Sequence, residues 1–214
     1  MESVVHLQDA GVSLGGRPVL RHVDLLLQPG ESVGVAGTNG SGKTTLIRAV
    51  ATLISIDRGS IEVLGSQPGA ADLVEVRRSI GLIGHQPSLL AELTLAENLE
   101  HAARLAGLDV SRVANALDVV GLAGAADRRA EAVSFGMKRR VEIAHLLITK
   151  PRLLLLDEAA SGLDESAREL IHALVGSVCG RGGGCLVVSH DRSQLGDLAA
   201  RVLNLSGGRL EPVA

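Results

Sequence analysis

Apolar and polar residues alternate over about the first 35 residues of the chain. Turn signals interrupt the alternation at Gly15-Gly16 and at Pro29-Gly30, a pattern typical of antiparallel hairpins. A short apolar run at residues 32–36 then predicts a buried strand, and residues 43–51 have the spacing of a helix. We therefore expect a small β-sheet first, followed by a strand, a glycine-rich loop and a helix.

Helical periodicity marks the middle of the chain, from about residue 73 to residue 149. It is clearest in three segments, residues 95–105, 111–120 and 136–149. The chain changes character here from strands to helices. The pattern therefore predicts a helical insertion.

The last third of the chain returns to alternating strands and helices. Four segments follow Pro151 in the order strand, helix, strand, hairpin: residues 153–156, 165–179, 185–188 and 201–210. Short, wholly apolar strands are typical of parallel sheets that helices cover on both faces. Because the chain contains no internal repeat or long linker, we predict one α/β domain over residues 1–214. Its parts are an N-terminal antiparallel β subdomain with the first half of the core (1–86), an inserted helical subdomain (87–150) and the second half of the core (151–214).

Composition narrows the class of protein. The 214 residues suffice to bury a full core, which must be aliphatic because the chain has one Phe, no Trp and no Tyr. A formal charge of −3 gives no sign of a nucleic-acid-binding surface. No apolar run approaches the ~18 residues of a membrane span, and the first residues lack the basic flank and apolar core of a signal peptide. We expect a cytoplasmic protein that binds no nucleic acid and is not itself inserted in a membrane.

The glycine-rich loop carries the first candidate chemistry. Its sequence, Gly37-Thr-Asn-Gly-Ser-Gly-Lys43-Thr44, matches G-x-x-x-x-G-K-[ST]. The glycines let backbone N–H groups converge on a phosphate at a helix N-terminus, while Lys43 adds a charge at the β- and γ-phosphates and the Thr44 hydroxyl can ligate Mg²⁺. The alternative is a glycine-rich turn with an exposed Lys, which the later motifs make improbable. The residues predicted to bind ATP here are Gly37, Thr38, Asn39, Gly40, Ser41, Gly42, Lys43, Thr44 and Thr45.

Two carboxylates follow the apolar strand at residues 153–156. Asp157 and Glu158 would then lie at the carboxyl edge of the sheet, where ligands bind in α/β folds. We expect Asp157 to hold Mg²⁺, through water, and Glu158 to act as the general base for the attacking water. On their own, two acids after a strand indicate only a solvated turn; the phosphate-binding loop favours the catalytic interpretation.

The order of these elements resembles the nucleotide-binding subunit of an ABC transporter over almost the whole chain. The resemblance implies a P-loop NTPase (RecA-like) core of the ABC ATPase type. Residues 133–137, Val-Ser-Phe-Gly-Met, stand where that family has its L-S-G-G-Q signature. By the resemblance, Ser134 and Gly136 would contact the γ-phosphate bound to a second subunit. Phe135 and Met137 depart from the common pattern, and Ser134 also fits a simple helix N-cap.

Two further motifs match the family. Ser161-Gly-Leu-Asp164 resembles the D-loop that couples the two sites of a dimer, although Ala159 replaces the usual Pro after the catalytic Glu. Val188-Ser-His190-Asp matches the switch histidine, which implies that His190 positions or polarises the γ-phosphate. A lone His after a strand is usually incidental, but this order of motifs favours a catalytic role.

Two positions are irregular. The family stacks adenine on an aromatic residue at the place that Leu14 occupies, so the base would rest on an aliphatic surface unless Leu14 is plain core. The family's Mg²⁺-sensing Gln falls on His85, with Gln86 one place later. The sequence leaves open which of the two side chains reaches the metal.

The resemblance also implies a function and partners: ATP binding and hydrolysis that power export through a separate membrane subunit. Two copies, or this chain with a close relative, would sandwich two ATP-Mg²⁺ as a homodimer or heterodimer. A separate integral membrane permease would dock near residues 86–99, on the cytoplasmic face of the cell membrane. The Gly-His-Gln-Pro string at 84–87 is most similar to the haem exporter ATPase of cytochrome c maturation (the CcmA type), and the Ser-Phe-Gly-Met-Lys-Arg-Arg segment to drug- and lipid-export ATPases. Two more functions fit the same motifs: a soluble ABC ATPase, such as an iron–sulfur assembly subunit, and a subunit that binds nucleotide without hydrolysing it.

Overall fold

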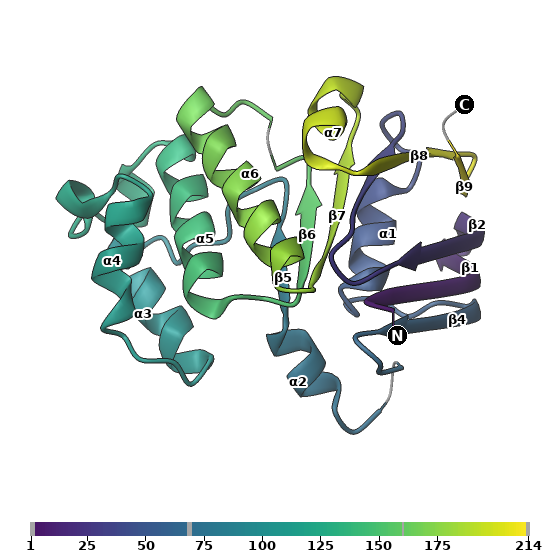
Figure 1. The fold of residues 1–214 in the computed structure, drawn as a ribbon, viewed down its shortest axis with the longest axis horizontal. Helices are drawn as coiled ribbons and strands as arrows, with labels where there is room; N and C mark the ends of the chain where they lie inside the picture. The colour runs from purple at the N-terminus through teal and green to yellow at the C-terminus, as the bar shows by residue number, and fades with distance from the viewer. Residues whose placement is uncertain (1–2, 68–69, 160, 213–214) are drawn as a thin grey trace.

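The computed structural model describes residues 3–67, 70–159 and 161–212. The predicted amino-terminal hairpin is confirmed: β1 (Val5–Leu14) and β2 (Arg17–Leu27) pair antiparallel around Gly15 and Gly16, whose φ angles of 57° and 76° suit glycine. β4 (Arg58–Val63), which the hydrophobic pattern did not reveal, pairs with the other edge of β1. The resulting sheet, in the order β2-β1-β4, lies at one end of the molecule (Figure 1).

A six-stranded sheet forms the centre of the molecule. Its order is β5-β6-β7-β3-β8-β9, with β3 (Ser32–Ala36), β5 (Ile80–Ile83), β6 (Leu153–Asp157), β7 (Gly184–Ser189), β8 (Arg201–Ser206) and β9 (Arg209–Pro212). All neighbours pair parallel except β8 and β9, which form the predicted C-terminal hairpin. The parallel strands therefore present their carboxyl ends at one edge.

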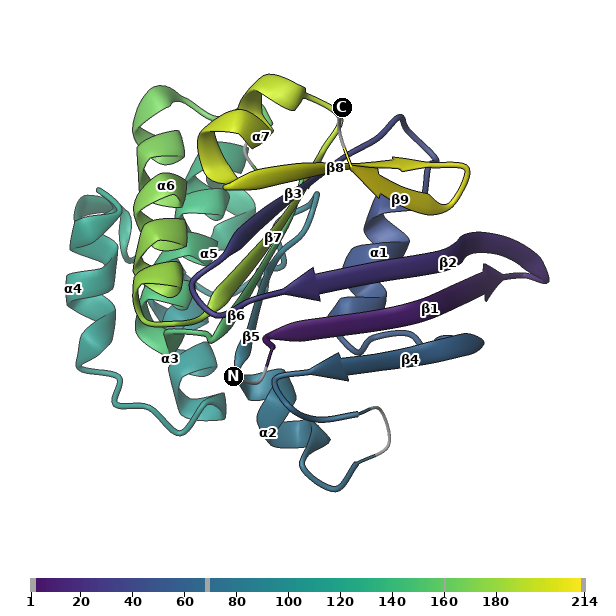
Figure 2. The same cartoon turned by 45° about the vertical axis from the view of Figure 1, so that its right-hand side comes forward.

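Helices cover both faces of this central sheet (Figures 1 and 2). α1 (Lys43–Val50) lies on the face that also carries the three-stranded sheet, whereas α5 (Phe135–Thr149), α6 (Glu165–Gly180) and α7 (Arg192–Leu198) lie on the other. The residues of β6 alternate accordingly. Leu153 and Leu155 pack with α1, and Leu154 and Leu156 pack with α5 and α6. This double burial explains why the strand is wholly apolar.

The predicted helical insertion is present beside the sheet. α3 (Leu95–Leu105) and α4 (Arg112–Val119) pack against α5. Two short 3-10 turns (Ala123–Ala125 and Ala130–Ala132) lie in the segment between α4 and α5. A capping box fixes the start of α3, since Thr94 accepts from the amide of Glu97 and Glu97 accepts from the amide of Thr94. No helix among the described residues is long and apolar enough to cross a membrane.

The helical pattern was wrong at the start of that region. After α2 (Leu73–Arg78) the chain forms β5, an edge strand of the central sheet, before the helices begin. Four apolar residues fit a strand and one helical turn equally well, and periodicity cannot separate them. The two-turn α7 was not predicted either.

Truncation of Leu154 tests the central core. Its side chain is 0% exposed in β6, so Leu154→Ala should lower the free energy of unfolding by about 3 kcal/mol. Leu105→Ala, at a side chain 68% exposed on α3, is the matched control and should change it by less than about 0.5 kcal/mol. Urea unfolding followed by circular dichroism measures both, and equal shifts in midpoint would contradict the packing described.

Candidate nucleotide-binding site

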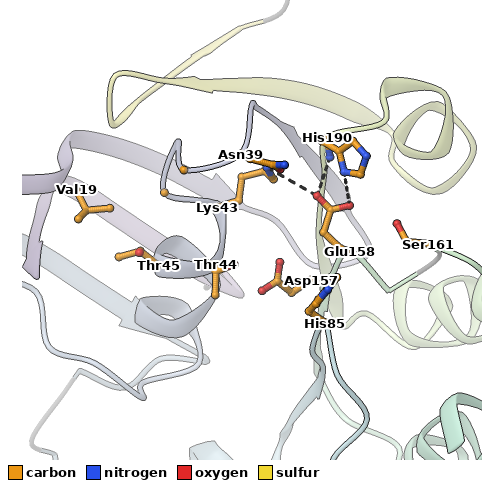
Figure 3. Close-up of a pocket in the computed structure, with 12 residues that line it drawn as sticks. Val19, Asn39, Lys43, Thr44, Thr45, His85, Asp157, Glu158, Ser161 and His190 are labelled. Carbon is orange, nitrogen blue, oxygen red and sulfur yellow. Dashed lines mark hydrogen bonds and ion pairs between the residues drawn. The ribbon is translucent and has the colours of Figure 1, made fainter. Parts of the chain in front are cut away.

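A cavity of about 460 Å³ opens at the carboxyl edge of the central sheet. Its walls come from the start of β2, the glycine loop, the first residues of α1 and the segments that follow β5, β6 and β7 (Figure 3). The lining residues are Val19, Asn39, Gly40, Gly42, Lys43, Thr44, Thr45, His85, Asp157, Glu158, Ser161 and His190. Glu158 and His190 therefore line the same cavity as eight other residues of the predicted site.

The glycine loop is shaped to hold an anion. Gly40 and Gly42 have φ angles of 79° and 108°, and a Cβ on Gly37 would lie 2.6 Å from Ser41 Oγ and 2.7 Å from the carbonyl of Leu205. No described side chain caps α1, so the unpaired amides of its first turn and the helix dipole favour a phosphate there. Ser41 Oγ is buried and has no hydrogen-bond partner among the described residues. Gly37, Thr38 and Ser41 line hollows next to the main cavity.

The Lys43 ammonium has three oxygen neighbours beside the loop. Its ammonium donates to the carbonyls of Gly37 (2.8 Å) and Thr38 (3.2 Å). Glu158 Oε1 lies 3.8 Å from the Lys43 Nζ atom, and the two side chains are 7% and 13% exposed. A phosphate entering the loop would therefore compete with Glu158 for this cation.

Glu158 is oriented by three further contacts. Its Oε1 accepts from the backbone amide of His190 (2.8 Å), and its Oε2 lies 3.0 Å from His190 Nδ1 (Figure 3). Its Oε2 also accepts from Ser189 Oγ (3.0 Å). Glu158 follows the last residue of β6 and has a φ of 55°, which is uncommon for a residue with a side chain. This backbone turn points the carboxylate toward the glycine loop and His190.

Thr44, Asp157 and His85, three of the residues predicted to lie near the metal, all line the cavity. Gln86, the other candidate, is exposed and does not line it. Among the described residues no group of three or more His, Cys, Asp or Glu could hold a metal alone. The Thr44 hydroxyl and the Asp157 carboxylate are the hard oxygen ligands that Mg²⁺ prefers, and Mg²⁺ usually completes its shell with phosphate oxygens and water. The donor set therefore fits Mg²⁺ bound together with a nucleotide, with His85 better suited to a hydrogen bond than to direct ligation.

The apolar wall of the cavity differs from the expectation. Leu14 lies at the tip of the β1–β2 hairpin, 47% exposed, and does not line the cavity. Val19 does, and it also lines the adjoining hollow beside the glycine loop. The sequence offered no signal for Val19, because it is one of several aliphatic residues in β2 and only the packing selects it.

The signature segment (residues 133–137) lies away from this cavity. Ser134, Gly136 and Asp164 line a separate hollow of about 360 Å³, together with Met137 and Arg140. Ser134 is also a helix N-cap, since its Oγ accepts from the amide of Met137 at 3.3 Å. Phe135 is 41% exposed. Within one chain, the signature segment and the phosphate loop therefore belong to different hollows.

Asp164 has two structural partners. It caps α6 by accepting from the amide of Ala167 (2.8 Å), and it pairs with Arg140 Nη2 (3.0 Å). The Ala167 amide, with Ser166 and Arg140, lowers the pKa of Asp164 below its ordinary value. Arg140 thus ties the signature helix α5 to the start of α6, a contact that the sequence did not indicate.

The fold and cavity define a phosphate-loop nucleotide-binding domain with an inserted helical subdomain. The ABC transporter family model matches residues 20–161, and the chain belongs to this family. The expected ABC-type ATPase fold is confirmed by solved structures. An ATP-binding subunit of an ABC transporter has a TM-score of 0.89 at 27% identity, over 97% of this chain and 88% of that one. A post-hydrolysis dimer of an ATP-binding cassette bound to ADP and Pi has a TM-score of 0.85 at 26% identity, over 97% of this chain and 96% of that one.

Three similar curated proteins are transport ATP-binding proteins. The Fe(3+) ions import ATP-binding protein FbpC of Streptomyces coelicolor is 38% identical over 213 residues, 97% of this chain and 61% of the relative. The Nod factor export ATP-binding protein I of Rhizobium etli is 32% identical over 211 residues, 97% of this chain and 66% of the relative. The methionine import ATP-binding protein MetN of Brucella abortus is 34% identical over 213 residues, 96% of this chain and 58% of the relative. The chain thus spans roughly three fifths of the length of these relatives.

A matched pair of truncations tests where the adenine lies. Val19→Ala should weaken ATP binding about fivefold, because it removes two methyl groups from the apolar wall of the cavity. Leu14→Ala should change the affinity less than about twofold, because Leu14 is outside that wall. Titration with a fluorescent ATP analogue measures both dissociation constants. A larger effect at Leu14 would place the base at the hairpin tip instead.

Proposed function

We propose that this chain binds ATP with Mg²⁺ and hydrolyses it as the ATPase subunit of an ABC transporter. The observation that carries the proposal is the meeting of Lys43, Glu158 and His190 with Thr44 and Asp157 in one cavity. Lys43 supplies a cation that can bind phosphate, Glu158 a carboxylate base and His190 a polarising imidazole. Thr44 and Asp157 supply two oxygen ligands for a divalent cation. Phosphoryl transfer asks a protein mainly for positioning and charge stabilisation, and this set offers both.

Each residue has a distinct task in hydrolysis. The amides of the phosphate loop and Lys43 hold the β- and γ-phosphates, and Thr44 with Asp157 holds the metal side. Glu158 accepts the proton of the attacking water, a contribution typically worth about 10²–10⁴ in rate. The Ser189 hydroxyl and the His190 amide fix the Glu158 carboxylate, and His190 stands next to it, where it can position the γ-phosphate.

A second subunit completes the site in this proposal. Ser134 and Gly136 line a hollow separate from the cavity that holds Lys43, so a single chain does not bring them to its own nucleotide. Apart from its two chain neighbours and the backbone of its own helix, no described residue has an atom within 4 Å of the place where a Cβ on Gly136 would be, which leaves room for a phosphate to approach. The solved relative with ADP and Pi is dimeric, which supports a homodimer, or a heterodimer with a close relative, that closes around ATP and separates after hydrolysis.

We place this subunit at the cytoplasmic face of the cell membrane, docked on an integral membrane permease. The named relatives are all transport proteins, which favours a transporter over an assembly-scaffold ATPase. The exposed loop between β5 and α3, with Leu90 47% exposed, is the proposed docking region. It connects the metal side of the cavity directly to the helices.

Import is the direction that we propose first. FbpC and MetN are named as importers of Fe³⁺ and methionine. Export is the second candidate, because the Nod factor exporter also matches 97% of the chain. None of these three relatives is a haem exporter, so haem export for cytochrome c maturation has only the Gly-His-Gln-Pro resemblance behind it.

Uptake of radiolabelled Fe³⁺ or methionine into cells with and without the gene tests import. Unchanged uptake of both would favour export.

Removal of the proposed base tests the function. Glu158→Gln should lower ATP turnover at least about 100-fold, because the amide cannot accept the proton of the attacking water. ATP binding should persist, so the variant should accumulate as a dimer in ATP and Mg²⁺. Phosphate release and gel filtration with light scattering measure the two effects. A monomer persisting in excess ATP would count against the proposal, and Glu165→Gln, an exposed acid in the first turn of α6, is the control.

A further inference from the structure

An ion pair is buried in the signature helix α5. Arg139 Nη1 and Glu142 Oε2 are 2.7 Å apart, and the two side chains are 1% and 10% exposed. Burial lowers the pKa of Arg139 and raises that of Glu142 from their ordinary values. Desolvation makes buried pairs costly, and apolar residues of the same volume are often as stable. Stability alone therefore does not account for this pair.

The remaining hydrogen bonds of the pair go to one loop. Arg139 Nη2 donates to the carbonyl of His85 (3.2 Å), and Glu142 Oε1 accepts from the amide of Ser88 (3.0 Å). Asn98 of α3 holds the next part of the same loop, because it accepts from the amide of Leu90 (2.8 Å) and donates to its carbonyl (3.1 Å). Three of the buried polar side chains of this protein thus bond to the backbone between β5 and α3.

This loop carries a side chain of the nucleotide cavity. The register of β5 and β6 pairs Ile83 with Leu156, so His85 and Asp157 emerge at the same sheet edge and line the same cavity. β5 ends at Ile83, and beyond that residue the strand ladder no longer holds the chain. The bond from Arg139 falls on His85 itself.

We propose that Arg139 and Glu142 are positioning residues for the metal side of the nucleotide cavity. By fixing the backbone at His85 and Ser88, they hold the His85 imidazole beside Asp157. The inference rests on the proposed function, since it assumes that ATP and a divalent cation occupy this cavity. It also explains why an Arg stands at position 139: its fork of donors reaches Glu142 and the His85 carbonyl at once, which one ammonium group cannot do in the same geometry.

The test is the affinity of the ATP complex for Mn²⁺, which replaces Mg²⁺ and is read by electron paramagnetic resonance. Arg139→Lys keeps the buried charge pair but gives up the bond to His85. It should weaken Mn²⁺ binding about tenfold, as losses of outer-shell contacts typically do, and leave ATP binding in EDTA unchanged. In a His85→Ala background the same substitution should cause no further loss, because the effect passes through His85.

A second variant and a control make the result decisive. Arg139→Met with Glu142→Leu replaces the pair by apolar residues of similar volume and should give the same tenfold loss. Glu100→Leu with Arg104→Met removes the exposed i,i+4 pair of α3, whose side chains are 36% and 63% exposed, and should change nothing. Wild-type Mn²⁺ affinity in the pair variants, or a loss that adds fully to that of His85→Ala, would overturn the inference. Loss of ATP binding in EDTA by both pair variants would assign the pair to the fold and overturn it as well.

The outcomes separate this inference from the proposed function. If the wild-type chain binds no ATP-Mn²⁺, the proposed function fails. If the wild-type chain binds it and the pair variants bind it equally well, only the positioning role fails.

Discussion

The parallel register of four strands is the constraint on which the site depends. β3 pairs with β7 so that Ala36 lies opposite Ser189, and β6 pairs with β7 so that Asp157 lies opposite Val188. β5 ends at Ile83, opposite Leu156 of β6. The phosphate loop, the two carboxylates, His190 and His85 therefore leave the sheet at one edge, although they are spread over more than 150 residues of sequence. A shift of one residue in any of these pairs would turn a site residue to the other face.

Charge is buried in this protein where it holds something in place. Lys43 and Asp157, at 7% and 5% exposed, line the cavity. Arg139 and Glu142 of α5 bond to the backbone of the loop that carries His85. The Lys43 ammonium donates to two carbonyls and lies 3.8 Å from Glu158 Oε1. A bound γ-phosphate would take the cation and leave the Glu158 carboxylate to water.

Local patterns predicted the elements that local physics determines. The wholly apolar run at residues 153–156 and the helical periodicity at residues 95–105 are visible in the sequence, and the strand and helix they indicate are present. β4 escaped notice because its six residues are half polar and are held only by pairing with β1. For the site, the motif spacing was enough to bring the phosphate loop, Asp157, Glu158 and His190 together. The catalytic roles and the domain boundaries at residues 86 and 150 stay predictions.

The features that the sequence could not supply depend on contacts between distant residues. The motif was compatible with either His85 or Gln86 as the metal-sensing residue. The end of β5 at Ile83 places His85 in the cavity and Gln86 outside it. The bond from Arg139 to His85 spans 54 residues, and nothing in the helical pattern of α5 distinguishes a buried guanidinium from an exposed one. Val19 became a cavity residue only through the approach of β2 to the phosphate loop.

The central claim is that one chain holds the hydrolytic residues and a second chain completes the site. The most direct measurement is the ATPase activity per chain in Mg²⁺ over a wide range of protein concentration. The account predicts that activity per chain rises with concentration and levels off when the dimer forms. Activity per chain that is constant down to the lowest concentration, with the protein monomeric throughout, would contradict it.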